Sequence, residues 1–130
     1  MIIENIASLN LHDSELISAE IRTTDERDDN ILLHLDYLLD YESFETKKKV
    51  LIFRRCWGAR FDMHFRYSGS DRIYSAKETT ESSFIDEIKN KYATVKLVPT
   101  SILRHFVIAT GLSGSQLDVV AEELHLVNST

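Results

Sequence analysis

The chain has 130 residues, 43% of them hydrophobic and 28% charged, and its formal net charge is −6. This length predicts one globular domain, residues 1–130, with enough apolar residues for a core. An acidic total argues against a nucleic-acid partner, because binding to phosphate requires cationic side chains. No run approaches the roughly 18 apolar residues that span a membrane, and residues 1–5 lack the features of a signal peptide. The single Cys56 cannot form an internal disulfide. We therefore expect a cytoplasmic protein with no membrane partner.

The charge is unevenly distributed along the chain. Residues 1–46 hold twelve acidic and two basic residues, whereas residues 47–72 hold eight basic and two acidic ones. One interpretation is that acidic and basic strands lie side by side and that their side chains pair across the sheet. The other is that they form two opposed surface patches, one of which meets a charged partner.

The first half of the chain contains two segments with the alternation of half-buried strands. Residues 2–11 fit either a short strand or a helical turn, and a turn follows. Residues 15–24 alternate, with Ile17, Ala19 and Ile21 on one face. Residues 31–41 alternate as well. There we expect the inward side chains to be Ile31, Leu33, Leu35, Tyr37, Leu39 and Tyr41, and the outward ones to be Leu32, His34, Asp36, Leu38 and Asp40.

The middle of the chain continues this pattern. Residues 48–55 predict a third strand, and Gly58 is expected to mark a bulge or bend. Residues 59–66 alternate again and continue as a strand. A turn is expected over residues 68–71, and a further short strand over residues 72–76.

One helix and a terminal hairpin complete the expected fold. Residues 83–92 carry an apolar stripe at helical spacing, and Ser83 followed by Asp86 fits a variant of the capping box. So short a helix must dock on a sheet to persist. Two apolar runs around a Gly/Ser turn predict a β-hairpin over the last twenty-five residues. The sequence therefore predicts an α+β fold, mostly antiparallel β-sheet, in the form of a curled sheet or sandwich with one short helix packed on it.

The adjacent residues His12, Asp13 and Ser14 combine a base, a carboxylate and a hydroxyl. A catalytic triad needs such groups close in space, and sequence neighbours seldom point at a common atom. The alternative is that Asp13 or Ser14 ties its side chain to turn backbone, with His12 packed beside it.

Three further groups suggest chemistry. His34, Asp36 and Asp40 share one face of a predicted strand and could ligate a divalent metal, or could form a solvated face opposite the basic strand. Cys56, close to arginines, could have a depressed pKa, or could be a small buried filler. Aromatic and arginine side chains interleave and could clamp a single-stranded nucleic acid, or could face the core and water respectively. They are Trp57, Phe61, Phe65 and Tyr67 with Arg54, Arg55, Arg60 and Arg66.

Several segments resemble a set of small bacterial proteins that open a β-hairpin with a hydrophobic residue followed by His-Asp-Ser or His-Asp-Ala. The matching positions are Leu11-His12-Asp13-Ser14, the strands over residues 16–21 and 31–37, and the runs over residues 103–108 and 117–122. Some members of this set are immunity proteins that neutralise toxins. The resemblance implies an α+β fold with an antiparallel sheet, and it implies no enzymatic activity and no catalytic residue.

We therefore predict a protein-binding domain of bacterial type without catalytic residues, cofactor or metal, whose partner is a basic protein such as a toxin. The acidic face expected to bind it comprises Glu20, Asp36, Asp40, Glu42 and Glu45. One alternative is a ligand-binding or metal-binding protein or an enzyme that uses His12, Asp13, His34 and Asp36. A second alternative is a homodimer formed through an exposed sheet edge.

Overall fold

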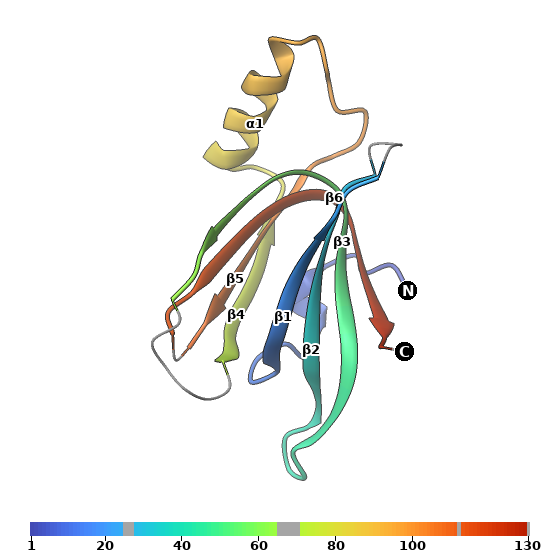
Figure 1. Cartoon of the computed structure of the whole chain (residues 1–130), viewed down its shortest axis with the longest axis vertical. Helices are drawn as coiled ribbons and strands as arrows, with labels where there is room; N and C mark the ends of the chain where they lie inside the picture. Colours follow the sequence, from blue (N-terminus) through green and yellow to red (C-terminus); the bar gives the residue numbers. More distant parts are fainter. Residues whose placement is uncertain (25–27, 65–70, 112, 130) are drawn as a thin grey trace.

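Six antiparallel strands form a closed barrel in the described part of the chain, with the order β1-β2-β3-β6-β5-β4. The computed structural model describes residues 1–24, 28–64, 71–111 and 113–129. The elements in chain order are a 3-10 helix η1 (Ile6–Ser8), β1 (Glu15–Arg22), β2 (Asn30–Asp40), β3 (Glu45–Asp62), β4 (Asp71–Thr79), α1 (Ser83–Ala93), β5 (Arg104–Thr110) and β6 (Gln116–Asn128). These elements confirm the predicted α+β fold, which is mostly antiparallel sheet with one α-helix in the described residues. The strand order specifies a closed barrel rather than a sandwich (Figure 1).

The barrel is held together mainly by β3, which pairs along its length with β2 and with β6. It is closed by a short seam in which Glu15 pairs with Arg72 and Leu16 pairs with Asp71. The β2–β3 hairpin projects beyond the other strands, and α1 lies at the opposite end of the barrel (Figure 1). None of the helices in the described residues has the length and apolar character needed to cross a membrane.

Strand β3 joins residues 48–55 to the first part of residues 59–66, two segments that the sequence predicts as successive strands. Its register with β6 shifts between Cys56 and Gly58, which confirms the bulge expected at Gly58. Arg55 adopts a left-handed conformation with φ of 56° at this bend. The absence of a side chain at Gly58 lets α1 approach closely, because a Cβ built there would lie 2.6 Å from Cδ1 of Ile88. The strand ends at Asp62, and residues 65–70 of the predicted strand and turn lie outside the described residues.

The core has two parts. The barrel interior contains the edge-to-face pair Phe53 and Phe106, whose ring centroids lie 5.1 Å apart. A second cluster seats α1 on the outside of β6 and comprises Phe84, Ile85, Ile88, Leu103 and Val120. The helix matches the predicted range, but its N-cap is Ser82 rather than Ser83, because the Ser82 Oγ accepts the hydrogen bond from the Ile85 amide.

Two expectations about strand faces were wrong. Leu32 and Leu38 are buried although they were expected outside, and Leu39 and Tyr41 are exposed although they were expected inside. The register between β2 and β3 shifts between Leu38 and Asp40, and this bulge turns the end of the strand that carries Leu39 and Tyr41. Leu32 and Leu38 precede the shift, so their burial comes from cover on the outer face of β2. Ile17 and Ile21 of β1 are also exposed, at 47% and 64%, since β1 continues past its two-residue seam with β4.

The ambiguous N-terminal segment forms η1 and a single bridge between Ile2 and His125. Ile6 is fully buried, so this segment covers one side of the core. The Ile6 amide donates to Glu78 Oε1 at 2.6 Å, and Arg104 donates to the carbonyl oxygen of Ile3.

Candidate functional site

Part of the uneven charge is neutralised by ion pairs between acids of the first half of the chain and basic residues of β3. Lys48 Nζ lies 2.8 Å from Asp36 Oδ1, and these residues face one another across β2 and β3. Arg54 Nη2 lies 2.8 Å from Asp28 Oδ2. The structure therefore favours the first interpretation of the charge pattern, pairing across the sheet, for these acids.

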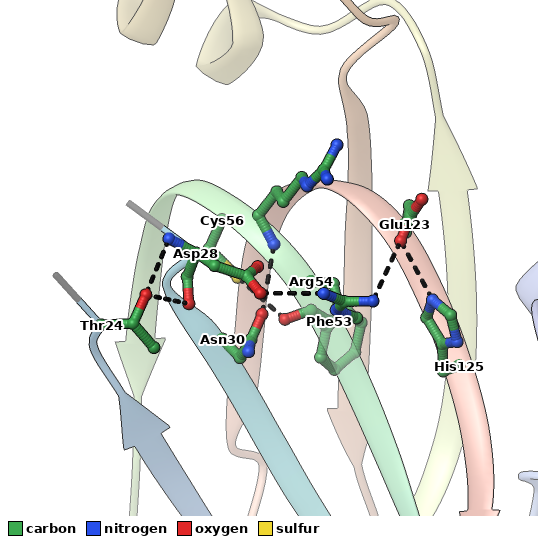
Figure 2. Close-up of polar contacts among 9 residues, drawn as sticks. Thr24, Asp28, Asn30, Phe53, Arg54, Cys56, Glu123 and His125 are labelled. Carbon is green, nitrogen blue, oxygen red and sulfur yellow. Dashed lines mark hydrogen bonds and ion pairs between the residues drawn. The ribbon is translucent and has the colours of Figure 1, made fainter. Parts of the chain in front are cut away.

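Figure 2 shows how this pairing continues around the bend of β3. The Arg54 guanidinium lies between Asp28 and Glu123, and Glu123 also contacts His125 Nε2 at 3.1 Å. The hydrogen bond from His125 holds the pKa of Glu123 below its ordinary value, and the bond to Asp28 raises the pKa of Arg54. These groups already satisfy one another, so they offer no free charge to a ligand.

Cys56 lies close to this network, and its thiol is held in the protonated form, unlike the thiolate of a nucleophilic cysteine. Burial raises the pKa of its thiol to about 12, and carboxylates on Asp28 and Asp29 add to the effect. The Sγ donates to the carbonyl oxygen of Phe53 at 3.3 Å (Figure 2). The depressed pKa considered for Cys56 is therefore wrong, because the nearby arginines do not offset its desolvation.

The residues considered for a metal site do not converge. His34 Nε2 contacts Glu20 Oε1 at 3.0 Å, while Asp36 pairs with Lys48. Asp40 instead accepts bonds from the Glu42 amide and the Ser43 hydroxyl, as a turn residue does. Within the described ranges, no three His, Cys, Asp or Glu side chains gather as a metal would require.

The turn formed by His12, Asp13 and Ser14 is built for structure. Ser14 is fully buried, and its Oγ donates to the carbonyl oxygen of Asn10 and accepts from the Leu38 amide. Asp13 has φ of 68°, and His12 Nδ1 contacts the carbonyl oxygen of Tyr74 at 2.8 Å. The side-chain hydroxyl is thus engaged by backbone groups rather than by the imidazole, which agrees with the tie to turn backbone considered for Ser14.

This turn lies against the projecting β2–β3 hairpin. The Tyr41 hydroxyl donates to the carbonyl oxygen of His12, and the His12 ring packs edge-on against Tyr74, with centroids 6.0 Å apart. A hollow of about 110 Å³ separates the hairpin from the turn. Its walls are Asp13, Glu15, Asp36, Leu38, Phe44, Thr46 and Arg72.

Several large aromatic and aliphatic side chains are exposed here. Phe44 is 65% exposed and Tyr74 is 67% exposed, and Tyr41 and Leu39 lie nearby in the chain at 45% and 44%. Phe44 also has φ of 55°, a conformation that favours Gly or Asn and is rare for a bulky residue. Local strain of this kind, held without burial of the ring, suggests a function for the side chain.

Acidic side chains surround these aromatic residues. In the part of the chain that the structure describes, no basic side chain forms an ion pair with Asp40, Glu42 or Glu45. We define the hairpin surface by its exposed apolar residues and its acids, which are Leu39, Tyr41, Phe44, Tyr74, Asp13, Glu15, Asp40, Glu42 and Glu45. Of the predicted acidic face, Glu20 and Asp36 lie outside this definition because both are ion-paired.

Several of the aromatic and arginine residues considered for nucleic acid are engaged within the fold, while Phe61 is 38% exposed. Trp57 packs edge-on against Tyr92 and donates its indole N–H to Glu122. Arg60 lies over the Phe84 ring and pairs with Glu87. Phe65, Arg66 and Tyr67 of that set lie outside the described residues.

Sequence reasoning missed a second serine, histidine and aspartate that the fold does bring together. His105 Nδ1 lies 2.9 Å from Ser82 Oγ, and its Nε2 lies 2.7 Å from Asp118 Oδ1. No local motif marks them, because 23 and 13 residues separate His105 from its two partners.

No protein-family model, curated protein or solved structure matches the chain in comparisons with known proteins.

Proposed function

We propose that the chain is a bacterial protein-binding domain that acts in the cytoplasm and binds a basic protein, such as a toxin, through the hairpin surface without modifying that partner chemically. The observation that carries the proposal is Phe44. This aromatic side chain is 65% exposed at the end of a projecting hairpin, in a backbone conformation that a glycine would adopt more easily. The fold gains little from it, so a contact outside the fold is the better explanation.

The chemistry of the surrounding residues supports a basic partner. Aromatic side chains supply most of the energy of many protein interfaces, and acidic side chains around them speed the capture of a cationic surface. Within the described residues, Asp40, Glu42 and Glu45 pair with no basic side chain, whereas Asp36 and Asp28 are paired with Lys48 and Arg54 of β3. The resemblance of Leu11-His12-Asp13-Ser14 to immunity proteins supports the same class of partner.

Phe44→Gly separates a binding role from a structural one. If the ring is kept for binding, the variant should be at least as stable as the wild type, because glycine accepts the left-handed conformation. It should also retain less partner when the immobilised chain is mixed with an extract of the native host and the bound proteins are quantified by mass spectrometry. A variant that loses stability and binds as before would contradict the proposal.

Charge reversal tests the electrostatic part. The double variant Glu42→Lys and Glu45→Lys should lose a basic protein that the wild type captures at low salt, and salt should weaken the wild-type interaction. The matched control is Glu4→Lys with Glu81→Lys, two exposed acids outside the hairpin surface. Equal capture by both double variants, or capture of no basic protein at all, would overturn the proposal.

A further inference from the structure

Ser82, His105 and Asp118 come from three different elements and meet beside the N-terminus of α1. Ser82 directly precedes the helix, His105 lies on β5 and Asp118 lies on β6. The side chains of His105 and Asp118 are only 10% and 18% exposed, while Ser82 is half-buried. The hydroxyl is thus backed by a largely dehydrated imidazole and carboxylate.

The strand register explains why these groups meet. Val107 faces Asp118 across β5 and β6, and His105 lies two residues before Val107, so His105 and Asp118 project on the same face as diagonal neighbours. The chain leaves β4 at Thr79, which pairs with His105, and reaches Ser82 three residues later. Phe84 then packs edge-on against the imidazole at 5.3 Å and holds the ring in place.

The hydrogen-bond partners define where the protons lie. Asp118 accepts a bond from Gln116 through its second oxygen, so the carboxylate is an acceptor on both sides. In the neutral imidazole, Nε2–H then donates to Asp118, and Nδ1 is the nitrogen that accepts the Ser82 hydroxyl proton. This order of hydroxyl, base and orienting carboxylate is the arrangement that activates a serine as a nucleophile.

We propose that Ser82, His105 and Asp118 form a nucleophilic site for acyl transfer, whose substrates are small esters or thioesters with an apolar acyl group. This activity is separate from binding by the hairpin surface. Beside Ser82, the Ser83 and Phe84 amides of the first helical turn make no hydrogen bond within the described part of the chain, so they can stabilise an oxyanion.

The reaction follows from these positions. The Ser82 Oγ bonds to the carbonyl carbon as its proton passes to His105 Nδ1, and the carbonyl electrons move to the oxygen. The bond from carbon to the leaving oxygen or sulfur then breaks, and that atom takes the proton from Nδ1. Water repeats the two steps on the acyl-serine, which releases a carboxylic acid and restores the hydroxyl. Asp118 stabilises the imidazolium throughout.

The preference for an apolar acyl group comes from the neighbouring hollow. A space of about 230 Å³ is lined by Trp57, Phe84, Ile88 and Tyr92 together with Arg60, Glu87 and Lys91. It meets the site through Phe84, which contacts His105, while Ser82, His105 and Asp118 do not line it themselves. Arg60 is already paired with Glu87 and stacked on Phe84, so the aromatic and aliphatic side of the hollow, formed by Trp57, Ile88 and Tyr92, would hold an acyl chain.

A fluorophosphonate probe that phosphonylates activated serines tests the proposal directly. The wild type should become labelled at Ser82, as located by peptide mass spectrometry, and p-nitrophenyl acetate should be hydrolysed. His105→Gln should slow labelling at least about tenfold, since it removes the base. Ser101→Ala, which removes an exposed serine hydroxyl outside the site, is the matched control and should be labelled as fast as the wild type.

The site of labelling in the wild type tests the proposal even if a variant fails to fold, because locating the label by mass spectrometry requires no substitution. Labelling of Ser82 no faster than that of the adjacent Ser83 would overturn the proposal and leave the three residues as a helix cap. An unchanged labelling rate in folded His105→Gln, checked by circular dichroism, would overturn it equally. Neither result depends on the hairpin surface, so the binding proposal stands or falls separately.

Discussion

Arg104 and Glu78 form an ion pair at the end of the barrel that also holds the N-terminal segment. The Arg104 Nη2 lies 2.8 Å from Glu78 Oε1, and the two side chains are only 14% and 11% exposed. The same carboxylate accepts the Ile6 amide, and the same guanidinium donates to the carbonyl oxygen of Ile3. Four groups from three parts of the chain are therefore satisfied together.

Arg104→Leu should lower the free energy of unfolding by about 3–5 kcal/mol, because it leaves the Glu78 carboxylate buried without its partner. Arg22→Leu removes an arginine from the exposed pair with Glu20 and should cost less than about 1 kcal/mol. Urea unfolding of both variants measures the difference. Similar small losses in the two would show that the buried pair does not hold the N-terminal segment.

Gly58→Ala should destabilise the protein by about 1–3 kcal/mol, because the new Cβ would meet Cδ1 of Ile88 at 2.6 Å. Ile88→Val removes that carbon and alone should cost about 0.5–1.5 kcal/mol. In the double variant the two losses should be less than additive, as thermal unfolding can measure. Strict additivity would mean that contact between β3 and α1 is not the reason for the glycine.

Stability should fall as acid protonates Glu20 and Glu123. Hydrogen bonds from Arg22 and His34 lower the pKa of Glu20, and the bond from His125 lowers the pKa of Glu123. A carboxyl whose pKa is lower in the folded state stabilises the fold above the unfolded-state value, near 4.5 here, and that stability is lost as the pH falls through the folded-state value. Glu20→Gln with Glu123→Gln should therefore flatten the decline in stability between about pH 5 and about pH 3.

The control for this pH dependence is Glu42→Gln, which removes an exposed carboxyl from the hairpin surface. Urea unfolding at each pH measures the free energy of unfolding of this variant and of the wild type. The two values should fall together as the solution is acidified. If the free energy of unfolding of the wild type falls no more steeply with decreasing pH than that of the double glutamine variant, Glu20 and Glu123 do not cause the acid destabilisation.

Cys56 should resist alkylation in the folded protein. A thiol with a pKa of about 12 is almost entirely protonated at about pH 8, and the side chain is also largely enclosed. Iodoacetamide should therefore modify it slowly until urea unfolds the chain, when the rate should rise by orders of magnitude. Intact mass spectrometry follows the reaction, and rapid modification of the native protein would contradict the burial.

The sequence predicted the strands well, because alternation is a local property that survives folding. It predicted faces less well, since a bulge reverses the side-chain order without leaving a mark in the alternation. Leu39 shows this at the end of β2, where the register shifts between Leu38 and Asp40 and Leu39 is exposed. Leu38 lies before the shift, on the side that the turn at Asp13 covers. Closure of the sheet into a barrel was also beyond local reasoning, because it depends on the pairing of β1 with β4 across some fifty residues of chain.

The candidate sites were predicted only in part. Asp40, Glu42 and Glu45 remain in the proposed binding surface, but Phe44 had no distinguishing pattern because its significance lies in its backbone angle. Ser82 was overlooked in favour of Ser83 as the helix cap, and its contact with His105 depends on where β4 ends. Such contacts follow from three-dimensional register, which one sequence alone does not specify.

The two-residue seam between β1 and β4 has a dynamic consequence. Opening it breaks few hydrogen bonds, whereas parting β3 from β2 or β6 would break a long ladder. Local opening at this edge should accordingly require less free energy than global unfolding. The backbone amides of β4 that face β1 should exchange with deuterium well before those in the centre of β3. Local opening of the barrel is thus expected at the pairing of β1 with β4.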